Sequence, residues 1–298
     1  MLSDFKRNWV LHLMVLPGFL LVLLFQYGPM AGAMIAFKKY LPSKGILGSP
    51  WIGLDNFKYM LLMPEASRVL MNTLIIAAMK IVVGLVVPIV VAILLNEIRK
   101  SFFKRVFQTL VYLPHFLSWV ILSGILIDLL SPNSGLINQL LKAIGMEPIF
   151  FLGDNDWFRF TLVTTDVWKD FGFGTIVYLA ALTSINPVLY EAAVIDGANR
   201  WRQTWHVTLP GMIPIIVLLA TLSLGNVLNA GFDQVFNLYN TLVYESGDII
   251  DTFVYRLGLQ QVQYGVASAV GLLKSVVSFV MITASYYLAY RFANYRIF

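Results

Sequence analysis

Six long apolar runs are the feature that most limits what this chain can fold into. They cover, approximately, residues 9–37, 68–96, 107–131, 158–185, 211–231 and 266–291. A helix needs about 20 apolar residues to cross the hydrocarbon core of a bilayer. Because backbone polar groups find no water there, a spanning segment must be a helix or belong to a closed barrel, and the short alternating strands of a barrel are missing. The sequence therefore predicts an all-α membrane protein, with six transmembrane helices in a single domain that covers residues 1–298.

The composition excludes an ordinary soluble domain and several kinds of active site. Charged residues make up 12% of the chain, whereas about 25% is usual in soluble domains. There is no cysteine, and the three histidines, His12, His115 and His206, are too far apart in sequence for a typical metal site. The net charge of +5 comes without a basic stripe, so it suits the anionic inner face of a membrane and does not indicate nucleic acid. We expect no metal and no cofactor in this chain.

A polar island interrupts the apolar pattern at residues 186–210, between the fourth and fifth runs. Asn186 can cap a helix whose first residue is Pro187, a position where the missing N–H has no cost. Gly197 then supplies a stop, and Asn199 can cap a second short helix. Two short helices that meet at a glycine form a protruding knob. Such a knob suits the docking of a partner and lacks the residues for chemistry.

The residues of this island resemble the EAA loop of ABC importer permeases. The matching positions are Glu191-Ala192-Ala193, Asp196-Gly197-Ala198, Val207 and Leu209-Pro210. One position departs from the family pattern, because the family often has phenylalanine where this chain has Thr204; the neighbouring Trp205 can fill the same cavity in the partner. The resemblance implies that the loop couples the chain to an ATPase. The coupling residues it implies are Glu191, Ala192, Ala193, Asp196, Gly197, Trp201, Leu209 and Pro210.

Two segments narrow the resemblance to carbohydrate importers. Residues 48–57, GSPWIGLDNF, are similar to the segment that follows the first helix in maltose-type permeases. Residues 27–40, YGPMAGAMIAFKKY, resemble the branch that handles oligosaccharides and polysaccharide fragments. The resemblance implies an importer with two permeases, two ATPase subunits and an external solute-binding protein. Since six helices form half of a pathway, a second, related permease is expected to complete it as a heterodimer.

The positive charges predict how the chain is oriented in a bacterial plasma membrane. Six spans place both termini on the same side, and Lys and Arg favour the cytoplasmic side in short loops. The residues expected inside are Lys6, Arg7, Arg99, Lys100, Lys104, Arg105, Arg200, Arg202, Arg291 and Arg296. The loops expected outside carry fewer such residues over almost twice the length. Both termini and the knob are therefore predicted to be cytoplasmic, where ATP is available.

Polar side chains within the predicted spans indicate a substrate site, since charge at membrane depth is costly and usually functional. Asparagine offers a donor and an acceptor to sugar hydroxyls, and Trp168 offers a flat platform to a sugar ring. In maltose-type permeases the helices before and after the EAA loop contact the sugar, and the resemblance places Trp168 and Ser223 at such positions. Ser223, Asn226 and Asn229 are expected on one face of the fifth helix. The predicted substrate residues are Asp166, Trp168, Lys169, Asp170, Ser223, Asn226, Asn229 and Lys274.

A packing role is the alternative for the same charges. Asp166 with Lys169, or Asp170 with Lys274, can neutralise each other and fix helix contacts. Three deep lysines, Lys80 included, face only these two deep carboxylates. Either Lys80 snorkels toward the interface or pairs with Asp128, or one ammonium is left over that an acidic sugar would neutralise.

The chain carries no motif that would supply energy or catalysis. GxxxxGK[ST], GxSxG and HExxH are all missing from the sequence. ATP hydrolysis with Mg²⁺ is therefore expected in separate subunits. Two alternatives stay open: a permease of the same fold for glycerol phosphate or a polyamine, and an intramembrane enzyme that acts on lipid-linked sugar through Asp166 and Asp170. The identity, length and charge of the sugar are also open.

Overall fold

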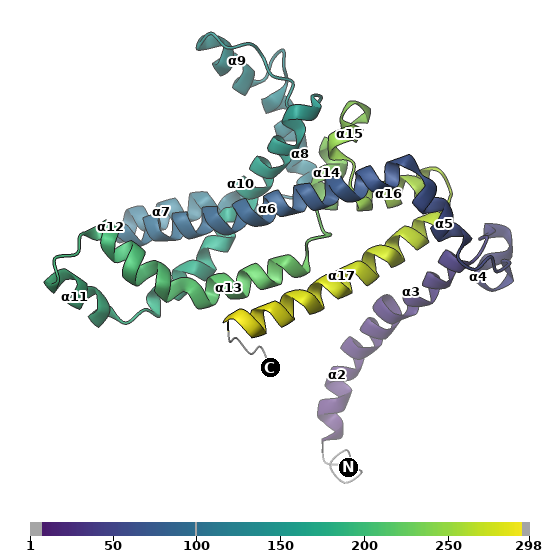
Figure 1. Cartoon of the computed structure of the whole chain (residues 1–298), viewed down its shortest axis with the longest axis horizontal. Helices are drawn as coiled ribbons and strands as arrows, with labels where there is room; N and C mark the ends of the chain where they lie inside the picture. The colour runs from purple at the N-terminus through teal and green to yellow at the C-terminus, as the bar shows by residue number, and fades with distance from the viewer. Residues whose placement is uncertain (1–7, 99, 294–298) are drawn as a thin grey trace. The chain divides into compact units, whose positions relative to one another are not determined.

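The computed structural model of the chain describes residues 8–98 and 100–293, with side chains up to residue 287. These residues form helices joined by loops, which confirms the all-α class (Figure 1). Both termini and the predicted inside charges Lys6, Arg7, Arg99 and Arg296 lie outside the described residues, as does the side chain of Arg291. The helices are α2 (Trp9–Val22), α3 (Gly28–Met30), α4 (Gly45–Gly48), α5 (Asp55–Leu62), α6 (Pro64–Glu97), α7 (Ser101–Tyr112), α8 (Trp119–Leu130), α9 (Leu136–Ala143), α10 (Asn155–Thr183), α11 (Pro187–Ile195), α12 (Arg200–Gln203), α13 (Leu209–Gly225), α14 (Phe232–Leu238), α15 (Tyr244–Gly247), α16 (Ile250–Tyr255) and α17 (Tyr264–Ala293).

The helices within the described ranges supply between four and six candidate membrane spans. Four are long and apolar enough individually: Trp9–Phe37, Pro64–Glu97, Arg200–Gly225 and Tyr264–Tyr287. Two further candidates consist of bent helix pairs, Ser101–Phe116 with Trp119–Leu130 and Asn155–Thr183 with Pro187–Ile195. Length and apolar composition agree with a chain embedded in a membrane.

The chain divides into two compact units, of which one contains residues 1–66 and 253–273. In this unit the turn-rich loop after the first helix is fixed by side chains. The Asn56 amide donates to the carbonyls of Ala36 at 2.8 Å and Lys38 at 3.1 Å. The Lys38 ammonium in turn donates to the Ile46 carbonyl at 2.7 Å. A loop predicted to be rich in turns thus has a defined conformation.

The other unit, residues 67–252 and 274–298, holds the polar residues and the knob. Its buried core near the knob joins three long helices through Ala92 of α6, Tyr178 and Leu182 of α10, and Met212 of α13. A Cβ at Gly172 would overlap the backbone of Val111, so glycine is what lets α10 approach α7 this closely. These contacts fix α6, α10 and α13 as the frame of the site.

The predicted third span, residues 107–131, is wrong as a single straight helix. A break at residues 117–118 separates two helical segments that meet at 103° (Figure 1). Pro114 lies in a short 3₁₀ turn before the break, where it lacks the N–H that would continue the helix. After the break, the Ser118 hydroxyl accepts from the Ile121 N–H at 3.4 Å and starts α8 as its N-cap. The apolar run is continuous, but its backbone turns sharply.

The predicted fifth span, residues 211–231, is shifted toward the knob. Helix begins at Arg200 and runs through a π-helical turn, Thr204–Thr208, into α13, which ends at Gly225. The second short helix expected in the knob is therefore the beginning of this span. Residues 226–231 are not helical, and Gly231 has a left-handed φ of +92°. Asn226 and Asn229 consequently lie beyond the helix and do not share a helical face with Ser223.

Candidate functional site

A cavity of about 280 Å³ lies among α6, α10 and the non-helical segment after α13. Four of the predicted substrate residues line it: Asp166, Ser223, Asn226 and Asn229. The remaining lining residues are Ala77, Lys80, Ile81, Gly84, Ala230 and Gly231. The break in the fifth span thus gathers the polar groups that a regular helix would have distributed differently. Carboxylate, amide and hydroxyl groups in one cavity can exchange hydrogen bonds with several hydroxyls of one ligand.

The backbone of residues 226–231 forms one wall of this cavity. The N–H of Asn229 bonds the carbonyl of Asn226 at 2.8 Å in a turn, and the chain then reverses through Gly231. A Cβ at Gly231 would lie 2.9 Å from the Lys80 ammonium, so this position requires glycine for both its φ and its space. Non-helical backbone within a transmembrane region is tolerated only where protein buries it or where it faces a water-filled cavity. This wall is therefore typical of a solute pathway.

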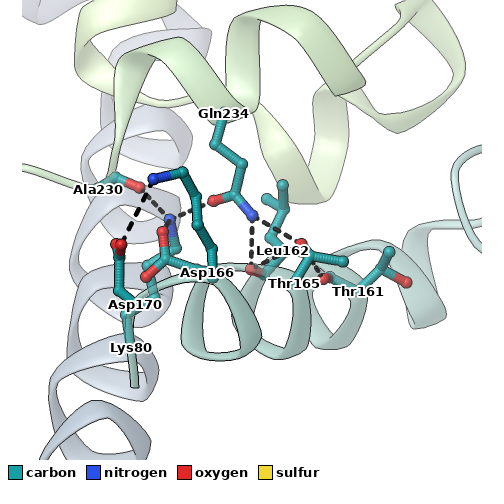
Figure 2. A network of polar contacts seen from close by, with 9 residues as sticks. Lys80, Thr161, Leu162, Thr165, Asp166, Asp170, Ala230 and Gln234 are labelled. Atoms are coloured by element: carbon teal, nitrogen blue, oxygen red, sulfur yellow. Dashed lines mark hydrogen bonds and ion pairs between the residues drawn. The ribbon is translucent and has the colours of Figure 1, made fainter. Parts of the chain in front are cut away.

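Lys80 holds the cavity together from α6. Its side chain is 9% exposed, and its ammonium bonds Asp166 Oδ1 at 2.8 Å, the carbonyl of Ala230 at 2.8 Å and the Oε1 of Gln234 (Figure 2). An ammonium has three N–H donors, and here each has an acceptor. Lys80 therefore joins α6 to α10 and to the segment after α13, with no donor left over for a ligand. Asp166, at 23% exposure, is the charged group that still faces the cavity.

Gln234 is the site residue that the sequence did not predict. It is completely buried, and its amide donates to the Leu162 carbonyl at 2.7 Å and the Thr165 hydroxyl at 2.8 Å (Figure 2). Its Oε1 is thereby aimed at Lys80. Gln234 lies just after the predicted fifth span, so the search for polar groups inside spans could not find it. The glycine three residues before it is the available signal, because it marks a turn back into the protein.

Lys169 and Asp170 belong to a second polar cluster at the bend between α7 and α8. The Lys169 ammonium donates to the His115 carbonyl at 2.9 Å and lies 3.5 Å from Asp170. The carboxylate of Asp170 lies 2.8 Å from Nδ1 of His115, and the imidazole stacks on Phe173 at 4.3 Å. Trp168, at 45% exposure, does not line the Lys80 cavity. These three predicted substrate residues therefore lie outside the lining of the Lys80 cavity, although Asp170 is one helical turn from Asp166 on α10 (Figure 2).

Lys274 forms a third pair, with Asp251 of α16 at 2.5 Å. The pairings expected from the sequence, Asp166 with Lys169, Asp170 with Lys274 and Lys80 with Asp128, are therefore wrong. The expected surplus ammonium is wrong too, because the count of deep carboxylates omitted Asp251. Each of the three lysines bonds a carboxylate or lies within ion-pair distance of one.

The knob has the local structure that its sequence predicts. The Asn186 side chain accepts from the Val188 N–H at 3.0 Å and caps α11, whose first residue is proline. Asn199 accepts from the Arg202 N–H at 2.9 Å and caps α12. Gly197 joins the two helices with a φ of +74°, and no atom would lie within 4 Å of a Cβ added there. The turn thus depends on the backbone freedom of glycine and not on tight packing.

The knob has both an ion pair to α6 and an exposed apolar surface. Arg200 pairs with Glu97, the last residue of α6, at 3.1 Å, beside a cavity of about 560 Å³ that Glu191 also lines. Ile195 and Trp201 are 85% and 71% exposed. Of the other predicted coupling residues, Ala192 and Ala193 lie on α11, Asp196 follows it, and Leu209 and Pro210 begin α13. Exposed apolar side chains around a rigid turn are typical of a protein-docking surface.

Comparison with known proteins shows which families share this architecture. The family described as binding-protein-dependent transport system inner membrane component matches residues 84–294. The chain is similar to YteP of Bacillus subtilis (strain 168), a polygalacturonan/rhamnogalacturonan transport system permease protein. The two sequences are 44% identical over 288 residues, and the matched region covers 97% of this chain and 90% of YteP. It also matches a crystal structure of a bacterial ABC transporter involved in the import of the acidic polysaccharide alginate, with a TM-score of 0.90, 39% identity, and coverage of 97% of this chain and 98% of that one. A structure of a bacterial alginate ABC transporter in complex with an alginate pentasaccharide-bound periplasmic protein matches with a TM-score of 0.89 at 38% identity, over 98% of this chain and 97% of that one.

We expect Lys80→Met to destabilise the purified full chain in detergent. Removing one partner of a buried ion pair costs about 3–5 kcal/mol, because the other charge is left without compensation. The double variant Lys80→Met/Asp166→Asn should regain part of this loss, since it leaves no uncompensated carboxylate. Lys142→Met, at an exposed lysine of α9, is the matched control and should unfold at the wild-type temperature. Equal unfolding temperatures for Lys80→Met and Lys142→Met would contradict the role of Lys80.

Proposed function

The chain belongs to the family of binding-protein-dependent transport system inner membrane components, and from this premise we propose that it is the permease subunit of an ABC importer that carries an oligosaccharide into the cytoplasm. The observation that carries the proposal is the Lys80 cavity. Its lining combines hydroxyl-binding groups with the non-helical backbone of residues 226–231, which a solute pathway can accommodate and a lipid-facing helix cannot. The family match, residues 84–294, covers the knob and the cavity lining from Gly84 onward, whereas Ala77, Lys80 and Ile81 precede it.

Oligosaccharides that contain uronic acid are the first substrates to test. The support comes from the similar proteins, one named for polygalacturonan and rhamnogalacturonan and one for the acidic polysaccharide alginate. The cavity itself offers the amides of Asn226 and Asn229, the hydroxyl of Ser223 and the carboxylate of Asp166. These groups recognise hydroxyls. Since the three donors of Lys80 all bond acceptors within the protein, this lysine offers no free donor to the carboxylates of the sugar chain.

The proposed assembly contains this chain, a second related permease, two ATPase subunits and a solute-binding protein outside the cell. The periplasmic protein bound in one similar structure supports the last of these partners. Six spans would put both termini on the same side of the membrane, and the Lys and Arg bias of the loops favours the cytoplasm for that side and for the knob. The exposed Ile195 and Trp201 then face the ATPase, and Glu191 lies at the edge of the docked surface.

Two alternatives from the sequence have less support. An intramembrane enzyme would need Asp166 and Asp170 to act as an opposed pair, but they lie four positions apart on the same helix, and each bonds another side chain, Asp166 to Lys80 and Asp170 to His115. An importer of glycerol phosphate would need a free cation for the phosphate, and Lys80, Lys169 and Lys274 each already have a carboxylate nearby. Binding of an oligosaccharide requires groups that bond hydroxyls, and the cavity has such groups.

Reconstitution tests the proposed function directly. The complex is purified with its partner subunits, inserted into vesicles and supplied with the binding protein loaded with a rhamnogalacturonan or polygalacturonan oligosaccharide. Uptake of labelled sugar should require ATP and the binding protein together. Cleavage of a lipid-linked sugar by the isolated chain would support the enzyme instead, and ATP-driven uptake of glycerol phosphate but not sugar would support the other importer.

We expect Gly197→Val to uncouple ATP hydrolysis from uptake. A branched side chain disfavours the left-handed backbone by about 1–2 kcal/mol, so the share of correctly shaped knobs, and with it uptake, should fall about five- to thirtyfold. Gly197→Asn is the matched control, because asparagine accepts this conformation better than other side chains and the position has free space. The two variants should be equally stable in the membrane. Identical uptake by both would show that the turn does not transmit motion.

Single introduced cysteines test the orientation, since the native chain has none. Ile195→Cys in the knob and Leu47→Cys in the first loop replace side chains that are 85% and 86% exposed. An impermeant thiol reagent added to intact cells should label only the cysteine at position 47. Labelling of position 195 should appear after the cells are permeabilised. The reverse pattern would overturn the orientation and, with it, the docking of the knob to a cytoplasmic ATPase.

A further inference from the structure

We propose that a second cavity, at the opposite end of α14 from the Lys80 cavity, is a subsite for an uncharged unit of the same sugar chain. This outer cavity has a volume of about 360 Å³ and lies between the end of α8, residues 131–152 and the end of α14. The lining residues that matter are Asp128, Ser134, Phe150, Asn237, Tyr239 and Asn240. The proposal rests on the proposed function, because it concerns how a long oligosaccharide is held.

The walls of the outer cavity are fixed by buried hydrogen bonds. Asn138, 1% exposed, donates to the carbonyls of Leu130, Ser131 and Ile149 at 3.0–3.2 Å, and its Oδ1 accepts from the Ile149 N–H at 2.7 Å. One side chain thus joins the two ends of the segment that contains α9, residues 131–152. The Asn240 amide donates to the Leu152 carbonyl at 2.8 Å and joins the third wall. A cavity with walls held in this way is preformed, as ligand sites usually are.

Two aromatic rings in the lining are held in place by their surroundings. Phe150 is 44% exposed, yet a Cβ at Gly153 would overlap its ring, so the ring lies directly on the Gly153 backbone. Tyr239 stacks on Tyr244 with ring centroids 5.2 Å apart. Exposed aromatic faces whose rotamers are fixed provide the platforms on which apolar faces of sugar rings pack.

The polar lining indicates an uncharged sugar unit. Asp128 is the one charged residue in the lining, and no described residue donates a hydrogen bond to it or pairs with it. A carboxylate accepts hydrogen bonds from neighbouring hydroxyls, whereas it repels the carboxylate of a uronic acid. The hydroxyl of Ser134 and the amide of Asn237 add donors and acceptors. A neutral, hydroxyl-rich ring matches this set.

The two cavities are related by α14. Gly231, just before this helix, lines the inner cavity, and Asn237 at its end lines the outer one. A helix of seven residues, Phe232–Leu238, is about 10 Å long. Ligand sites have volumes of roughly 300–1,000 Å³. The inner cavity, about 280 Å³, lies just below this range and the outer one, about 360 Å³, at its lower end, so each suits a part of an oligosaccharide. A long chain reaches both cavities, while a disaccharide in the inner cavity does not.

Uptake of two chain lengths tests the subsite. The probes are rhamnogalacturonan oligosaccharides of two and six units, in which neutral and acidic sugars alternate, each delivered by the loaded binding protein to the reconstituted complex. Phe150→Ala should lower the ratio of hexasaccharide to disaccharide uptake by roughly two- to tenfold, the range expected for one aromatic contact. Asp128→Asn should raise uptake of an all-acidic hexagalacturonate relative to the alternating hexasaccharide. Ile144→Ala, an exposed residue of the same segment but outside the cavity, is the control and should keep the wild-type ratios.

Protection of an introduced cysteine provides a readout that does not depend on transport. Ser134→Cys should react more slowly with a soluble thiol reagent when the complex binds the hexasaccharide, and at the unchanged rate with the disaccharide. Ile144→Cys should react at one rate throughout. Equal loss of uptake for both lengths in Phe150→Ala would assign the cavity to docking of the binding protein, and an unchanged ratio without protection would also overturn the subsite. Failure of the proposed function looks different, because wild-type complex would then take up neither oligosaccharide.

Discussion

Every backbone polar group within a membrane needs a hydrogen-bond partner, and this requirement governs the structure. Lys80 supplies such a partner to the non-helical backbone after α13. Most of the fifth span meets this requirement because its backbone groups bond one another within a helix. Residues 226–231 are not helical and need other partners. Lys80 crosses from α6 to the carbonyl of Ala230 and, with Gln234, fixes the direction in which the chain continues. The positive charge that makes this possible requires Asp166 beside it. Remove the ammonium, and a carbonyl, an amide oxygen and a carboxylate all lose a donor.

The same helix that carries Lys80 also reaches the knob. Lys80 and Glu97 are 17 positions apart on α6, which corresponds to about 25 Å along the axis. Glu97 bonds Arg200, and the buried contacts of Ala92 with Tyr178 and Met212 hold α6, α10 and α13 together just above that ion pair. Since an exposed ion pair contributes little by itself, the packed core is the firmer connection. A displacement of the knob is therefore expected to move both walls of the inner cavity, because each is built on one of these helices.

The sequence predicted those features that depend on neighbours in the chain. Asn186 and Asn199 cap their helices through N–H groups two and three positions away, so residue identity and spacing were enough. The apolar runs predicted the long helices because a helix that spans a bilayer needs a minimum length of apolar residues, which can be read from local composition. The ion pairs were not accessible in this way: Lys80 and Asp166 are 86 positions apart, and hydropathy does not fix depth well enough to choose among several carboxylates. The bend at Ser118 and the buried Gln234 were missed because the first lies within a run that is apolar enough for one span despite Pro114, and the second lies beyond the end of a run.

The saturated bonding of Lys80 has a consequence for how the cavity behaves when nothing occupies it. A site whose charges were completed only by its ligand would be unstable while vacant, and it would hold its ligand tightly once filled. Here the three donors of the ammonium already have acceptors within the protein, on Asp166, Ala230 and Gln234. An empty cavity therefore leaves no donor of Lys80 unpaired, and an arriving sugar exchanges its hydration for a few amide, hydroxyl and carboxylate contacts. A conduit gains from such weak holding, because a solute that binds shallowly at each stage also departs quickly toward the next.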